Sequence, residues 1–103
     1  MPSKSEPCGL SQMIACRYGT VPIVRECGGL ADTIVAYNQF DGSGNGFSFK
    51  NYNAHEMMHV IKNALNIYAD KEKWQKIVKT SMLSDFSWNL SAKKYIDIYN
   101  SLL

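Results

Sequence analysis

The sequence predicts an α/β fold in which short parallel strands are followed by three helices. Two observations carry this prediction. A helical pattern, a glycine stop and a buried apolar strand follow one another in residues 10–24, which makes half of a strand–helix–strand unit. Three amphipathic helical patterns then follow in series through the second half of the chain. With 103 residues, the chain has room for one hydrophobic core and forms one small domain at most.

The first predicted helix covers residues 10–18. Leu10, Met13, Ile14 and Tyr18 recur there at helical spacing, and Gly19 stands where a helix stop is expected. This helix leads directly into the predicted strand.

The run 21–24 is a short β-branched apolar segment of the kind found in buried parallel strands, and Pro22 confines it to an edge or to its first residues. Gly28 and Gly29 follow at its carboxyl end, where open α/β sheets place ligands. The glycine pair forms either a ligand loop or a tight turn.

Residues 33–37 read as a short extended segment, residues 38–45 as an exposed polar loop, and residues 46–49 as a second strand with alternating aromatic residues. Asn53 is the expected N-cap of the next helix, with Glu56 completing a capping-box pattern. The residues at helical spacing in the next two helices are Met57, Ile61, Ala64, Leu65 and Tyr68, then Trp74, Ile77, Val78 and Met82.

A last helix over residues 90–103 places Ala92, Tyr95, Ile96, Tyr99 and Leu102 on one face. We expect the partner of this apolar face to lie outside the chain. Just before it, Phe86 and Trp88 are either anchors of an interhelix corner or a carbohydrate-stacking platform.

Composition excludes several classes of protein. The 11 Lys and Arg against 9 Asp and Glu are spread along the chain, so no nucleic-acid partner is indicated. Cys8, Cys16 and Cys27 are odd in number and form no CxxC pair, which predicts neither disulfides nor a zinc ribbon and favours a reducing, cytoplasmic compartment. No apolar run approaches the ~18 residues that span a bilayer, so we expect a soluble protein without a membrane partner.

The stretch 5–12 is the most informative part of the chain. Glu6 precedes Pro7, Cys8 and Gly9 at the mouth of the first predicted helix. In one interpretation Glu6 is an ordinary first-turn acid that complements the helix dipole. In the other, the N–H groups of Cys8, Gly9 and Leu10 form a cradle for an anionic or polyhydroxyl ligand, and Glu6 accepts hydrogen bonds from its hydroxyl groups.

Residues 55–59 match the H-E-x-x-H pattern, in which His55 and His59 would bind zinc and Glu56 would act as general base. The extended form of the motif is absent, because Lys62 and Leu65 stand where it requires Gly and His. The same residues fit the cap and solvent face of an amphipathic helix, which is the interpretation we favour.

Ordered motifs along the whole chain resemble a known family. PSKSEPCGLSQ at 2–12, RYGTVPIVR at 17–25 and GGLADT at 28–33 resemble the carboxyl-terminal part of bacterial glycogen synthases and plant starch synthases. GNGFSF at 44–49 and DFSW at 85–88 match later landmarks of the family in the same order. The resemblance therefore runs essentially from end to end.

This resemblance implies a GT-B glycosyltransferase with two Rossmann-like domains, which transfers glucose from ADP-glucose to the non-reducing end of an α-1,4-glucan with retention and without a cofactor. Residues 1–103 would form the carboxyl-terminal portion of the donor-binding domain, and residues 90–103 would pack on the missing N-terminal domain. Glu6 matches the family's catalytic glutamate. The backbone of Cys8, Gly9 and Leu10 would lie against the donor sugar and diphosphate, and Gly28 and Gly29 would bind substrate or shape the cleft wall.

Two departures limit what the chain is expected to do alone. Lys4 and Ser5 replace the Arg and Phe usual in the family, and the first domain with its Lys-x-Gly-Gly motif is absent. The motif at Glu6 also begins without room for a preceding strand, as in a piece of a longer protein. We expect the isolated chain to be inactive and to self-associate through uncovered apolar faces. A stand-alone nucleotide- or glucan-binding module is the alternative, and a zinc protein is a further one.

Overall fold

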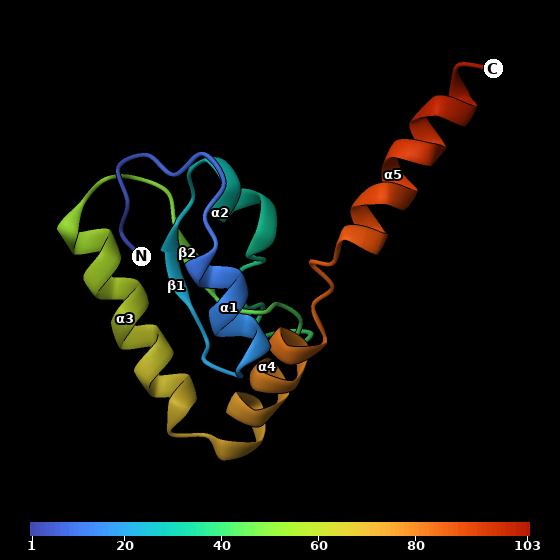
Figure 1. The fold of residues 1–103 in the computed structure, drawn as a ribbon. Helices are drawn as coiled ribbons and strands as arrows, with labels where there is room; N and C mark the ends of the chain where they lie inside the picture. The colour runs from blue at the N-terminus through green and yellow to red at the C-terminus, as the bar shows by residue number, and fades with distance from the viewer.

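The computed structural model describes all residues from 1 to 103 and has the predicted mixed α/β composition (Figure 1). Its elements in chain order are α1 (Ser11–Arg17), β1 (Ile23–Arg25), α2 (Gly28–Thr33), β2 (Phe47–Phe49), α3 (Ala54–Tyr68), α4 (Lys71–Leu83) and α5 (Trp88–Ser101). The predicted order of short strands followed by three helices is confirmed.

The two strands pair in parallel, with Ile23 opposite Phe47 and Arg25 opposite Phe49. Pro22 lies just before β1, and its carbonyl accepts the Phe47 N–H at 2.9 Å. Because proline stands outside the strand, its missing N–H removes no hydrogen bond between the strands. On the other edge of β1, the amino group of Met1 donates to Ile23 O at 2.7 Å and the Arg25 N–H donates to Met1 O at 3.0 Å. Of the extended segment predicted at 33–37, only a single bridge between Ala36 and Gly46 forms.

The core consists of two clusters on opposite faces of the sheet. Val24 belongs to the first cluster, whereas its neighbour Ile23 packs against the second, because successive residues of a strand point to opposite faces. The first cluster contains Cys16, Val24, Leu30 and Ile34, and the second contains Phe47, Ala64, Ile67 and Ile77. Helices α1 and α2 thus cover one side, and α3 and α4 cover the other.

The glycine pair forms the start of helix α2, which begins at Gly28, so the expectation of a tight turn was wrong. The substrate role expected of the pair stays a prediction. The Gly28 backbone has a φ of +49°, which lets the chain leave β1 and enter the helix within a few residues. The carboxyl end of β1 is consequently followed at once by a helix N-terminus.

The predicted cap of α3 is present, since Asn53 Oδ1 accepts the N–H groups of His55 at 2.7 Å and Glu56 at 3.3 Å. In a capping box Glu56 would accept the N–H of Asn53, but here it reaches two residues further back and accepts the Asn51 N–H at 3.3 Å. The inward face of α3 differs from the prediction: Ala64 and Ile67 are buried, whereas Leu65 is 61% exposed. Helical spacing alone does not separate the residues at the centre of a buried face from those at its two edges, which stay exposed.

Helix α5 projects away from the rest of the molecule (Figure 1) and has no buried residue. It begins at Trp88, where Ser87 Oγ accepts the Leu90 N–H at 3.4 Å. Of the two aromatic residues beside it, Phe86 packs against the first core cluster, whereas Trp88 is 85% exposed and anchors nothing. The apolar face of α5 has no partner within the chain.

None of these helices combines the length and the apolar character that crossing a bilayer would require.

Candidate functional site

Glu6 lies half-buried on the loop that leads into α1. Its carboxylate Oε2 accepts a hydrogen bond from Ser3 Oγ at 2.9 Å, and its backbone carbonyl accepts the Gly29 N–H at 2.9 Å. The first turn of α2 therefore holds the backbone of Glu6 in place. Because α2 directly follows β1, this loop sits at the carboxyl ends of the parallel strands, where open α/β sheets bind ligands.

Gly28 and Gly29 permit this close approach. A Cβ atom on Gly28 would overlap the carbonyl oxygen of Glu6, and one on Gly29 would overlap the carbonyl oxygen of Cys8. Both obstacles are backbone atoms, which cannot swing aside as a flexible side chain does. The glycine pair thus lets α2 contact the Glu6 loop backbone to backbone.

Six consecutive backbone N–H groups, from Cys8 to Met13, donate to no acceptor within the chain. The first N–H of the helix that is paired belongs to Ile14 and donates to Leu10 O at 3.0 Å. The helix begins at Ser11, one residue after the predicted start at Leu10, so Cys8 and Gly9 precede it. A run of free N–H groups beside a helix start provides donors for an anionic or polyhydroxyl ligand.

Gln12 is a central residue of the site that the sequence analysis missed. It is fully buried, and its Nε2 donates to Cys8 O at 3.3 Å, Gly9 O at 3.1 Å and Thr33 Oγ1 at 3.1 Å. These bonds turn the carbonyl groups of the loop inward and tie the loop to α2. A glutamine in the first turn of a helix is ordinarily exposed, so the sequence pattern carries no signal for this role.

Arg25 holds the other side of the same loop and was also missed. Its Nη1 donates to Ser3 O at 3.2 Å and to Lys4 O at 2.9 Å, just before Glu6. The guanidinium carbon lies 5.7 Å from the centre of the Tyr52 ring, within the range of a cation–π contact. Because Arg25 is the last residue of β1, these hydrogen bonds attach the segment before Glu6 to the end of the strand.

The three thiols have different environments. Cys8 is exposed in the loop next to Glu6, Cys27 is half-buried, and Cys16 is buried in the first core cluster. Burial raises the pKa of the Cys16 thiol, and a hydrogen bond with Ser81 opposes this shift in part. Cys8 is therefore the thiol most accessible from the site.

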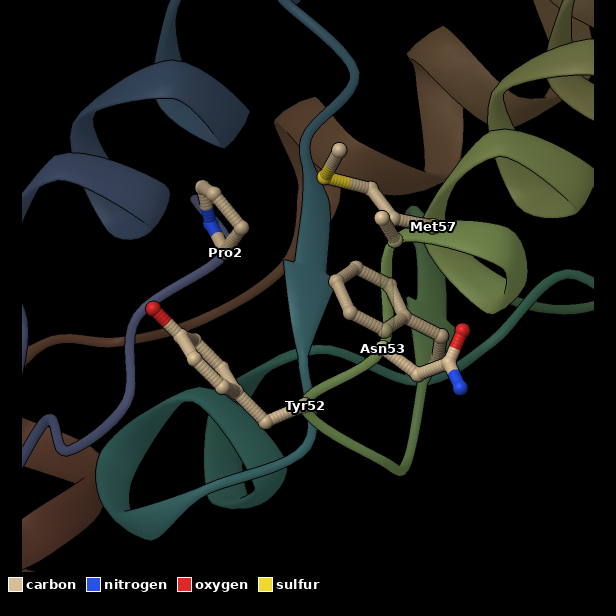
Figure 2. Close-up of a pocket in the computed structure, with 6 residues that line it drawn as sticks. Pro2, Tyr52, Asn53 and Met57 are labelled. Carbon is tan, nitrogen blue, oxygen red and sulfur yellow. The ribbon is translucent and has the colours of Figure 1, made fainter.

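One hollow of about 290 Å³ lies apart from these residues (Figure 2). Pro2, Tyr52, Asn53 and Met57 surround it, together with Phe49 and Ala54. No charged side chain and none of the predicted site residues lines it. This hollow is an apolar gap between the amino-terminal segment and α3, distinct from the surface around Glu6.

The zinc interpretation receives no geometric support. The chain brings together no group of three or more His, Cys, Asp or Glu side chains that could hold a metal ion. Glu56, the required general base, instead accepts the Asn51 N–H, and this hydrogen bond lowers the pKa of its carboxyl group. The H-E-x-x-H pattern here belongs to a helix cap.

Known proteins share extensive similarity with this chain. The chain is 60% identical over 102 residues to a glycogen synthase of Clostridioides difficile, covering 99% of this chain and 21% of the relative. It is 59% identical over 103 residues to a glycogen synthase of Lachnospira eligens, covering 99% of this chain and 22% of the relative. The chain thus spans about a fifth of the length of these curated relatives.

Among solved structures, the chain matches the catalytic domain of starch synthase IV from Arabidopsis thaliana bound to ADP and acarbose. The TM-score is 0.83 at 40% identity, covering 97% of this chain and 21% of that one. Residues 1–81 also match the family model of group 1 glycosyl transferases, which is more than three quarters of the chain. The chain therefore belongs to the group 1 glycosyl transferase family, and its relatives within that family include glycogen synthases.

Proposed function

We propose that this chain forms part of the donor-binding domain of a glucan synthase, which transfers glucose from ADP-glucose to the non-reducing end of an α-1,4-glucan with retention of configuration. The observation that carries the proposal is that Glu6, whose backbone carbonyl is held by the Gly29 N–H, lies two residues before a run of free N–H groups from Cys8 to Met13. The likeness to a starch synthase catalytic domain bound to ADP supports a nucleotide-sugar donor.

The proposed division of labour follows from charge. When the bond between glucose and the diphosphate breaks, negative charge grows on the leaving diphosphate and positive charge on the sugar ring. Preorganised backbone N–H groups at Cys8, Gly9 and Leu10 stabilise the leaving anion without reorienting. Glu6 accepts hydrogen bonds from sugar hydroxyl groups and favours the positive charge on the ring. Gly28 and Gly29 keep both groups at a fixed separation.

Two further features of the proposed protein extend beyond the chain. Helix α5 exposes its apolar face, and we infer that this face packs on an N-terminal domain that carries the acceptor side of the cleft. Three free cysteines support a reducing, cytoplasmic location. An isolated chain has half a cleft, so it cannot hold donor and acceptor in reacting geometry.

The test compares the isolated chain with the complete synthase that contains it. Incubated with ADP-glucose and glycogen, the complete protein should incorporate glucose, and Glu6→Gln should reduce the rate by about 100-fold or more. The isolated chain should show no incorporation above its own Glu6→Ala control. A complete synthase in which Glu6→Gln keeps wild-type activity would overturn the assignment of Glu6.

A further inference from the structure

The side-chain amide of Gln12 is held in one orientation. The side chain is fully buried, and its Nε2 donates to Cys8 O, Gly9 O and Thr33 Oγ1 at 3.1–3.3 Å. The Thr33 hydroxyl donates its own proton to Gly29 O at 2.8 Å, so toward Gln12 it acts as an acceptor. Three acceptors thus surround Nε2, and exchanging the two ends of the amide would turn an oxygen toward all of them.

The other end of the amide has no partner. Gln12 Oε1 is buried and accepts no hydrogen bond within the chain. It lies beside Gly9, where a Cβ atom would come within 2.6 Å of it. A buried acceptor without a donor is unfavourable, and a methionine of similar length would fill the same space without that cost. The hydrogens of Nε2, and not packing, therefore account for an amide at this position.

The hydrogen bonds from Nε2 set the direction of two peptide groups. In a planar trans peptide the C=O and the N–H point in opposite directions. With the carbonyls of Cys8 and Gly9 held toward Gln12, the N–H groups of Gly9 and Leu10 point away from it. Neither N–H has an acceptor within the chain. One buried side chain thus aims two adjacent donors.

Without Gln12 these peptide groups would be free to turn over. Gly9 has a φ of +73°, and glycine adopts positive and negative φ about equally readily. Rotation of the peptide between Cys8 and Gly9 would carry the Gly9 N–H inward and release Cys8 O to the exposed side of the loop. The backbone of Gly9 alone therefore does not determine where the two N–H groups point.

We propose that Gln12 is a positioning residue of the transfer reaction, which aims the N–H groups of Gly9 and Leu10 at the diphosphate of the donor. The proposal rests on the proposed function, which places the donor against these N–H groups. Gln12 itself is fully buried and acts through the direction of the two donors. Backbone N–H groups stabilise a growing negative charge best when they already point at it, so their direction affects donor binding and transfer.

The test pairs Gln12→Glu with Asn45→Asp in the complete synthase. Each change replaces the donor end of a buried amide by an oxygen, and Asn45 Nδ2 donates to Thr33 O and Ser84 Oγ, outside the Glu6 loop. Gln12→Glu should raise the KM for ADP-glucose and lower kcat/KM about 100-fold, with the KM for glycogen unchanged. Asn45→Asp should leave both KM values unchanged. A merely structural role would reduce the fraction of folded enzyme, which lowers kcat and changes neither KM.

The direction of the N–H groups has a separate readout in the 103-residue chain. The new carboxylate of Gln12→Glu should draw the N–H groups of Gly9 and Leu10 inward, so that NMR detects their hydrogen exchange slowed about tenfold. In Asn45→Asp their exchange should match that of the wild type. Gln12→Met removes the donor without adding a charge, and it should raise the KM for ADP-glucose in the same way if Gln12→Glu does not fold.

The possible results separate this role from the proposed function. A wild-type KM for ADP-glucose in Gln12→Glu or in folded Gln12→Met would overturn the positioning role, even if amide exchange slows. The proposed function would still stand if Glu6→Gln abolished transfer in the same synthase. A raised KM in the Gln12 variants together with full activity of Glu6→Gln would support the positioning role and count against the assigned role of Glu6.

Discussion

The contact between α2 and the Glu6 loop makes Gly29→Ala the sharpest test of how the site is held. A Cβ at this position would lie 2.7 Å from Cys8 Cα, whereas unbonded carbon atoms pack about 3.5–4.0 Å apart. The carbonyl oxygen of Cys8 would be closer still, so the loop and the helix must separate by at least about 1 Å. At that separation the hydrogen bond from the Gly29 N–H to Glu6 O, now 2.9 Å, is lost.

The energetic terms have opposite signs. Losing the hydrogen bond costs about 1 kcal/mol, and forcing a methyl group into a packed contact costs about 1–3 kcal/mol. Alanine gains about 1 kcal/mol over glycine inside a helix, which offsets the hydrogen bond. We expect the free energy of unfolding to fall by about 2 kcal/mol. Displacing Glu6 by about 1 Å should lower the transfer rate of the complete synthase by about 100-fold.

Urea unfolding followed by circular dichroism measures the first effect, and glucose incorporation into glycogen measures the second. Gly42→Ala is the control: unlike Gly29 it has a positive φ, at +72°, and its Cβ would meet only the flexible end of the Lys76 side chain. This control should lose about 1 kcal/mol of stability and keep its transfer rate. A Gly29→Ala synthase that transfers glucose within about threefold of wild type would refute the proposed positioning role.

Four further outcomes are expected. Gln12→Ala should lower the free energy of unfolding by about 2–4 kcal/mol in urea, because the carbonyl groups of Cys8 and Gly9 lose their hydrogen-bond donor. As a control, Asn53→Ala removes an exposed helix cap and should cost only about 1 kcal/mol. Ellman's reagent should label Cys8 in the folded chain and Cys16 only after unfolding. Because burial raises the pKa of the Cys16 thiol, the stability that its neutral form contributes should be present below the pKa of the unfolded thiol, about 8.5, and decline as the pH rises toward the folded value, measured as a falling urea midpoint. Deleting residues 88–103 should leave the urea midpoint unchanged, since α5 buries nothing, and should lower the mass seen by light scattering if its apolar face drives self-association.

Local patterns predicted much of the fold. The N-cap at Asn53 is confirmed because a side-chain cap depends only on neighbours in sequence. The strand predicted at residues 21–24 is present but shifted, since β1 is Ile23–Arg25 and Pro22 directly precedes it. A short β-branched apolar run indicates a buried strand but not its limits. The glycine pair was misjudged because two adjacent glycines are typical of a turn, and only the approach of the Glu6 loop explains why a helix begins there.

The sequence by itself determined the kind of chain this is: an α/β segment with Glu6 just before a helix and a last helix whose apolar face has no partner. Only the tertiary structure decided how the site is held. Gln12 donates to the hydroxyl of Thr33, and Arg25 donates to the carbonyl groups of Ser3 and Lys4. These partners are distant in sequence, so the contacts leave no periodic pattern. The backbone-to-backbone contact at Gly29 cannot be predicted from a sequence pattern either, because the atoms in contact are backbone atoms that every residue has. Side-chain identity therefore indicates which group does the chemistry, whereas its position is set by contacts that form only when the strands and helices pack.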